Sequence, residues 1–118
     1  MLCAQPPARS PLLVTEKDNG KSVQRMIGQT LAIQLPSNPS TGYTWEVQRL
    51  KGPILEGGRR YIPAGSHTPG AGGVESMEFH AQETGTEAIT LYYRRSWEHD
   101  PPARTFTLTV KIIPCGKK

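Results

Sequence analysis

Three side chains of the types used in nucleophilic catalysis lie close together near the C-terminal end of the chain. Ser96, His99 and Asp100 carry a hydroxyl, an imidazole and a carboxylate, which are the groups of a Ser-His-Asp triad. A working triad, however, is assembled from separate elements of a fold, and no Gly-x-Ser-x-Gly elbow surrounds this serine. We therefore expect solvent-exposed loop residues and no enzymatic activity. A hydrolase that uses Ser96 or His99 is the competing hypothesis, and it predicts turnover that is lost when either residue is replaced.

The histidines and cysteines do not have the spacing of a metal site. His67, His80 and His99 lack the paired spacing of a zinc-binding helix, and Cys3 and Cys115 lie near opposite ends of the chain. We expect no metal and no other cofactor. The two cysteines are compatible with one disulfide that closes a large loop or with two free thiols, and we slightly favour free thiols.

The composition is that of one small globular domain. Of the 118 residues, 36% are hydrophobic and 20% are charged, and the chain contains 12 glycines and 11 prolines. It is therefore too apolar for a disordered chain and too rich in turn-forming residues for a helical bundle. The net charge is only +4, and without a basic run or an RNA-binding motif it argues against a nucleic-acid partner. No stretch has the ~20 apolar residues of a membrane span, and we expect a monomer when the protein is free.

Short runs in which hydrophobic and polar residues alternate predict a sandwich of β-strands. Such alternation is typical of strands with one buried face, and about seven runs are separated by Gly, Pro and Asn. Only Ser22–Ile27 could instead form a helical turn, which Gly28 would end. We predict an antiparallel β-sandwich of about seven strands over residues 12–114, with a disordered or extended arm at 1–11 and a tail at 115–118. The expected core residues are Leu31, Ile33, Trp45, Phe79, Leu91, Phe106 and Leu108.

Three connections between these strands have unusual compositions. They are Asn38–Gly42, Pro63–Gly73 and Ser96–Pro102. Because the strands are expected to run alternately up and down, these three connections emerge at the same end of the sandwich. Loops on a rigid scaffold are frequent binding sites, so we expect a binding surface at this end.

Trp97 lies in the third connection, outside the alternating pattern of the core. It is either a lid over one end of the core or an exposed aromatic anchor for a partner. Arg94 and Arg95, just before it, could supply forked hydrogen bonds. Gly72 and Gly73 lack a Cβ, so their backbone could lie close against another protein.

The three connections also resemble the motifs of a known family. Asn38-Pro39-Ser40-Thr41-Gly42-Tyr43-x-Trp45 resembles the Asn-Pro-Thr-Thr-Gly-Phe/Tyr-x-Trp signature of the chagasin family of cysteine-peptidase inhibitors. Gly70-Ala71-Gly72-Gly73 is similar to the family's second, glycine-rich loop, and Arg95-Ser96-Trp97 is similar to its third, Arg-Pro-Trp. The three motifs occur in the family's order, and the likeness covers about Leu13 to Ile112.

This resemblance implies an immunoglobulin-like sandwich that inhibits papain-like cysteine peptidases reversibly and competitively, without being cleaved. Ser40 and Thr41 would lie nearest the catalytic cysteine and histidine of the peptidase, Gly70–Gly73 would run along the cleft, and Arg95 with Trp97 would contact the opposite wall. Ser40 departs from the family's threonine but keeps a hydroxyl, whereas Ser96 replaces a proline and removes a restraint on φ. The implied peptidase-binding residues are Asn38, Pro39, Ser40, Thr41, Gly42, Tyr43, Gly70, Ala71, Gly72, Gly73, Arg95, Ser96 and Trp97.

An alternative hypothesis is a non-inhibitory immunoglobulin-like module, such as an adhesion or envelope protein, in which the three loops are ordinary turns. An assay of papain inhibition separates this hypothesis from the first. A papain-like target, together with the absence of an intact signal peptide, favours a processed protein in a secreted or periplasmic location, with the cytoplasm as the second choice.

Overall fold

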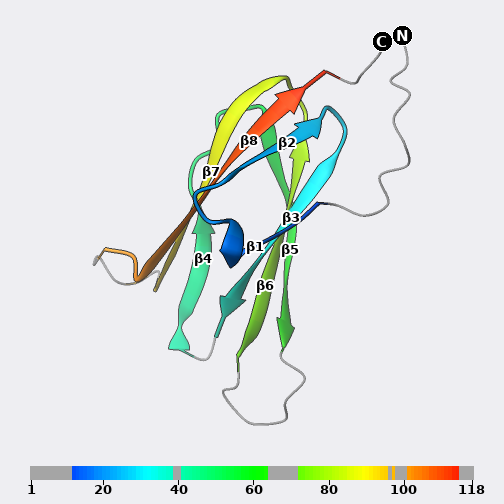
Figure 1. Cartoon of the computed structure of the whole chain (residues 1–118). Helices are drawn as coiled ribbons and strands as arrows, with labels where there is room; N and C mark the ends of the chain where they lie inside the picture. Colours follow the sequence, from blue (N-terminus) through cyan, green and yellow to red (C-terminus); the bar gives the residue numbers. More distant parts are fainter. Residues whose placement is uncertain (1–11, 39–40, 64–71, 96, 98–100, 115–118) are drawn as a thin grey trace.

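The computed structural model describes residues 12–38, 41–63, 72–95, 97 and 101–114, and these residues form a β-sandwich (Figure 1). The described part of the chain has eight strands and one short 3-10 helix, η1. In chain order they are β1 (Leu12–Thr15), η1 (Glu16–Asp18), β2 (Ser22–Met26), β3 (Thr30–Ser37), β4 (Tyr43–Val47), β5 (Ile54–Pro63), β6 (Gly73–Ala81), β7 (Gly85–Arg95) and β8 (Arg104–Ile113). Within these ranges, no helix is long and apolar enough to cross a bilayer.

The strands form two four-stranded sheets, in the orders β1-β3-β6-β5 and β2-β8-β7-β4. Both sheets are antiparallel except at one edge each, where β1 runs parallel to β3 and β2 runs parallel to β8. The helix η1 carries the chain from β1 in the first sheet to β2 in the second. The predicted all-β sandwich is therefore confirmed.

The helical turn considered at Ser22–Ile27 is not formed, because Ser22–Met26 is the strand β2. Every residue of β2 is in register with a residue of β8, and Val23 packs against the core. Pairing with a distant strand thus outweighs the local preference of a short segment. Gly28 does end the element, with φ of 93°. This additional strand raises the count to eight.

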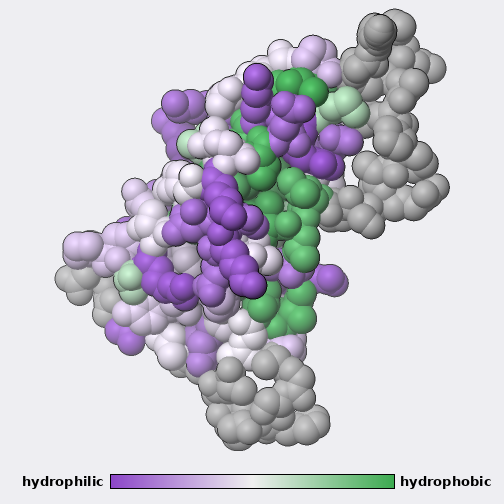
Figure 2. Space-filling view, viewed as in Figure 1, coloured by the Kyte–Doolittle hydropathy of each residue, from purple (hydrophilic) through white to green (hydrophobic). Residues whose placement is uncertain are grey.

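The core lies between the sheets and contains all seven residues predicted for it. Leu31, Ile33, Trp45, Phe79, Leu91, Phe106 and Leu108 are all at most 2% exposed. Figure 2 shows hydrophobic residues on this face near the edge strand β1, on which Leu13 is 55% exposed. The rest of this face is largely polar (Figure 2), as expected for a sandwich with one buried face in each sheet.

A buried carboxylate closes the turn between β4 and β5. Glu87 on β7 is 2% exposed, and its side chain accepts hydrogen bonds from the backbone N–H groups of Lys51 and Ile54. A buried carboxylate is tolerated in a protein core when its oxygens are hydrogen-bonded in this way. Glu87 therefore has a structural role: it holds the β4–β5 connection at the end of the sandwich where β7 begins.

We expect Glu87→Gln to lower the free energy of unfolding by about 1–3 kcal/mol. The amide keeps one acceptor oxygen but turns an NH₂ donor toward a backbone N–H that then lacks a partner. Urea denaturation measures the change. Glu78→Gln is the matched control, because the Glu78 side chain is 45% exposed, and it should change stability by less than ~0.5 kcal/mol. Equal effects of the two replacements would contradict the structural role of Glu87.

The strand ends that flank the three unusual connections lie at one end of the sandwich. In the first sheet, Gly73 at the start of β6 is in register with Ser37 at the end of β3 and with Pro63 at the end of β5. In the second sheet, Tyr43 at the start of β4 is in register with Arg95 at the end of β7. Figure 1 shows these strand ends together in the lower part of the view. We call this end of the molecule the loop end.

Candidate protein-binding site

The first loop is closed by hydrogen bonds of its own residues. The Thr41 hydroxyl and the Thr41 backbone N–H both donate to the carbonyl oxygen of Asn38, at 2.7 and 3.1 Å. The N–H of Asn38 donates to the Tyr93 hydroxyl at 3.1 Å, which ties the loop to the second sheet. The turn is completed by Gly42, whose φ of 85° favours glycine. Pro39 and Ser40 lie outside the described residues.

Trp97 of the third connection lies directly over Gly42 of the first. A Cβ built on Gly42 would be 2.4 Å from Cη2 of the Trp97 ring, so a larger residue would force the indole or the turn to move. The indole is nevertheless 65% exposed and does not act as a lid over the core. Of the two hypotheses for Trp97, its position fits the exposed anchor.

Arg95 holds the first loop from the side of β7. Its Nε donates to the carbonyl oxygen of Thr41 at 3.0 Å, and its guanidinium carbon lies 4.5 Å from the centroid of the Tyr43 ring, a cation–π contact. The Tyr43 ring stacks on Tyr93 at 5.1 Å, and Tyr93 contacts Trp45 at 4.8 Å. A row of aromatic rings thus connects the core to the loop end. Arg95 was predicted to contact a partner, and it also positions the chain's own first loop.

The C-terminal end of the second connection lies against the start of the first. Gly72 has φ of 80°, and a Cβ built on it would lie 3.3 Å from the carbonyl oxygen of Ser37. Gly73 follows as the first residue of β6, in register with Ser37. The glycines therefore allow the two loops to lie close together. Gly70 and Ala71 lie outside the described residues, as does Ser96 of the third loop.

The structure therefore brings the described site residues into one cluster at the loop end. They are Asn38, Thr41, Gly42, Tyr43, Gly72, Gly73, Arg95 and Trp97. His99 and Asp100 of the triad-like segment, His67, and both cysteines lie outside the described residues. Among the residues that are described, no three His, Cys, Asp or Glu side chains are placed to hold a metal ion.

Three residues that contact the first loop or the strand after it were not predicted from the sequence. Tyr93, whose hydroxyl accepts from the Asn38 N–H, follows the alternation of an ordinary strand. Glu75 and Arg59 both bind the backbone of Trp45. Glu75 occupies the phase of the buried residues Met77 and Phe79, and a charged residue in a buried phase is a signal that could have been used. Arg59 carried no such signal, because a bulge in β5 changes the phase of the alternation before it.

The arrangement presents a closed turn, a glycine-rich edge and an exposed indole on a rigid two-sheet scaffold. An aromatic side chain surrounded by pre-organised loops is typical of surfaces that bind another protein. The fold and the site therefore define a protein-binding domain of the immunoglobulin-like type, with a recognition surface built from three loops at one end.

Comparison with known proteins identifies the family. Residues 25–110 match the chagasin family of peptidase inhibitors, I42, and the chain belongs to this family. It is 33% identical to chagasin of Trypanosoma cruzi, over 83% of this chain and 94% of chagasin, and 35% identical to amoebiasin-1 of Entamoeba histolytica, over 84% and 97%. The crystal structure of the cysteine protease inhibitor EhICP2 from Entamoeba histolytica superposes with a TM-score of 0.73 at 25% identity, covering 86% of this chain and 94% of that one.

Family membership confirms the resemblance predicted from the three loop motifs. The chain is a member of a family of peptidase inhibitors and is not an enzyme. Neither the adhesion or envelope module nor the hydrolase is supported by these comparisons.

Proposed function

We propose that this protein inhibits papain-like cysteine peptidases reversibly and competitively, by filling the active-site cleft with its three loops. The observation that carries the proposal is the contact between loops distant in sequence, in which Trp97 covers Gly42 and Arg95 binds the Thr41 carbonyl. Because the loops support one another in the free protein, little conformational entropy is lost when a partner binds.

The first loop is the part proposed to enter the catalytic centre, with Ser40 and Thr41 nearest the peptidase's cysteine and histidine. A papain-type thiolate attacks a carbonyl that is presented in extended geometry, with its oxygen facing oxyanion donors. In this loop the Asn38 carbonyl already accepts two hydrogen bonds from Thr41 within a closed turn. The Asn38 carbonyl is therefore already engaged and does not face the oxyanion donors, which is why the first loop is proposed to occupy the cleft without being cleaved.

The second and third loops are proposed to flank the first along the cleft. Gly70–Gly73 would approach the peptidase closely, because its three glycines lack side chains. Trp97 would contact the opposite wall with the exposed part of its indole. Arg95 would act at the edge of this contact, through its hold on Thr41 and Tyr43.

We expect the protein to inhibit papain competitively toward a small peptide substrate and to be released intact. Inhibition should disappear on dilution, because no covalent bond is formed. Mass spectrometry after long incubation with the peptidase should give the mass of the uncut chain. Stoichiometric cleavage between Asn38 and Tyr43 would show instead that the first loop is a substrate, and the absence of inhibition at micromolar concentrations would contradict the proposed function.

A further inference from the structure

The strand that follows the first loop has an open edge. Among the described strands, β4 is the last of its sheet and pairs only with β7. Backbone N–H and C=O groups on the free side of an edge strand need other partners, and they otherwise bind water or another strand. The strand begins at Tyr43, directly after Gly42, so its position determines where the first loop lies.

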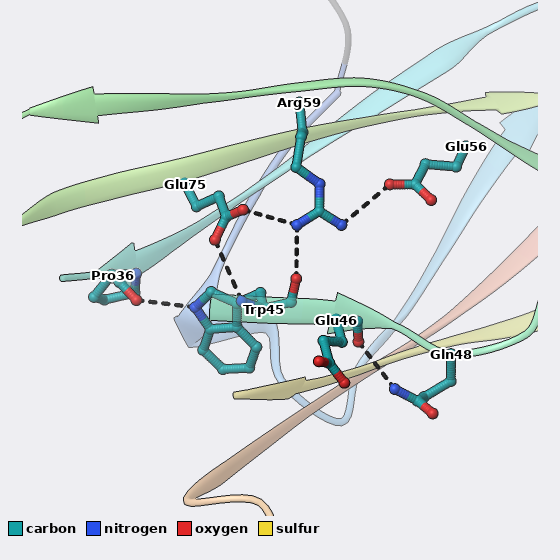
Figure 3. Close-up of polar contacts among 7 residues, drawn as sticks. All are labelled: Pro36, Trp45, Glu46, Gln48, Glu56, Arg59 and Glu75. Atoms are coloured by element: carbon teal, nitrogen blue, oxygen red, sulfur yellow. Dashed lines mark hydrogen bonds and ion pairs between the residues drawn. The ribbon is translucent and has the colours of Figure 1, made fainter. Parts of the chain in front are cut away.

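Two side chains of the other sheet occupy this open edge at Trp45 (Figure 3). The Trp45 N–H donates to Oε1 of Glu75 at 3.3 Å, and the Trp45 carbonyl accepts from Nη1 of Arg59 at 2.7 Å. The same Nη1 lies 2.8 Å from Oε2 of Glu75. The ion pair therefore provides an acceptor and a donor to one residue of β4, as a neighbouring strand would.

Arg59 reaches β4 because of a bulge in β5. The register of β5 against β6 shifts between Glu56 and Arg59, where the chain reads Gly57-Gly58. In an uninterrupted strand Gly58 would face Met77, and Arg59 would point to the outer face of the sheet. The extra residue instead places Arg59 opposite Met77, on the face toward β4.

Trp45 also connects the two sides of the first loop. Its indole Nε1 donates to the carbonyl oxygen of Pro36 at 2.9 Å, two residues before Asn38. Its backbone is held by Arg59 and Glu75, three residues after Gly42. A residue that is 2% exposed and fixed in this way holds both strands from which the loop emerges.

We propose that Arg59 and Glu75, which we call the β4 anchor, are a positioning pair that holds the first loop in its binding conformation. This inference rests on the proposed function. The anchor does not touch the peptidase; it sets the fraction of molecules whose loop is in place. Because an apparent dissociation constant equals the intrinsic constant divided by that fraction, lowering the fraction to about a tenth raises the dissociation constant about tenfold.

The test compares Arg59→Met and Glu75→Gln with Glu87→Gln. Methionine keeps the unbranched stem of Arg59 but is shorter and donates nothing to Trp45, and because the Arg59 side chain is 37% exposed this variant is expected to fold. Glu75→Gln keeps an acceptor for the Trp45 N–H but removes one of the two carboxylates paired with Arg59. The other is Glu56, whose Oε2 lies 3.3 Å from Nη2 of Arg59. Glu87→Gln removes a buried carboxylate that also binds backbone N–H groups, but at the end of the sandwich away from the loops.

We expect Arg59→Met to raise the dissociation constant for papain at least about tenfold, and Glu75→Gln to raise it by a smaller factor. Glu87→Gln should lower the melting temperature and leave the dissociation constant unchanged, because a protein that stays folded in the assay still presents the loops. Backbone amide exchange of Trp45, measured by NMR on the free protein, should accelerate in the two anchor variants and not in Glu87→Gln.

The proposal is overturned if Arg59→Met matches Glu87→Gln either in papain binding or in Trp45 amide exchange. If the unaltered protein inhibits papain and the anchor variants inhibit it equally well, the anchor fails while the proposed function stands. If the unaltered protein does not inhibit papain, the proposed function fails, and the exchange of the Trp45 amide still decides whether the anchor holds β4.

Discussion

Replacing Trp97 with alanine is expected to weaken binding to papain by at least about tenfold while the melting temperature hardly changes. The indole is 65% exposed in the free protein, so its removal takes little from the folded state. An aromatic anchor buried on binding contributes about 2 kcal/mol or more to affinity, which corresponds to more than a tenfold change in the dissociation constant. Since most interface replacements act on dissociation, the complex should separate faster, with a nearly unchanged association rate.

Leu55→Ala is the matched control for this prediction. Leu55 is a large hydrophobic residue that is 53% exposed, but it lies at the start of β5, away from the loop end. Surface plasmon resonance on both variants separates a specific loss at Trp97 from a general loss of exposed hydrophobic area. If Trp97→Ala unfolds the domain, or if Leu55→Ala weakens binding equally, Trp97 is not an anchor of the kind proposed.

Gly42→Ala is expected to reduce inhibition by at least about tenfold and also to destabilise the protein. A side chain at φ of 85° is strained, and such a replacement costs more than ~1 kcal/mol when the native φ is positive. The added methyl group would also occupy a position 2.4 Å from the Trp97 ring, so the indole or the turn must move. One methyl group therefore disturbs both the first loop and the third. The loss of inhibition is measured with a steady-state assay of papain.

Gly20→Ala separates the backbone strain from the displaced indole. Gly20 has φ of 84°, close to that of Gly42, and a Cβ built on it meets no atom within 4 Å. It should therefore show a similar loss of stability with unchanged inhibition. In a background that already carries Trp97→Ala, Gly42→Ala should cost less in inhibition than it does alone, because residues in contact are not additive. Full additivity would mean that Gly42 and Trp97 act independently.

The class of fold and the positions of the three loops were both predictable from the sequence. Alternation of hydrophobic and polar residues is local and repeats within each strand, so the core residues Leu31, Phe79 and Phe106 could be identified without coordinates. Each loop motif is a contiguous run of residues, so it can be recognised from the residue types alone. Up-and-down strand order was then enough to place the three loops at one end.

Contacts between those loops were decided only by the tertiary structure. That Gly42 lies under Trp97 and that Arg95 binds the Thr41 carbonyl depends on how β4 and β7 pair, and no local pattern contains that information. The strand β2 was missed for the same reason, because its pairing with β8 joins residues more than eighty positions apart. Local preference is weak in short segments, and pairing between distant strands overrides it.

The β4 anchor shows most clearly what the sequence alone could not determine. Gly57-Gly58 indicates an irregular strand. The sequence does not show whether an extra residue is inserted there, and so it does not show which face of the sheet the side chains after the glycines take. Only the register of β5 against β6 shows that Arg59 lies on the inner face of its sheet. Only the packing of the two sheets brings Arg59 and Glu75 to the open edge of β4. Sequence patterns record the period of each strand, whereas register and sheet packing are properties of strand pairs that meet only in the folded chain.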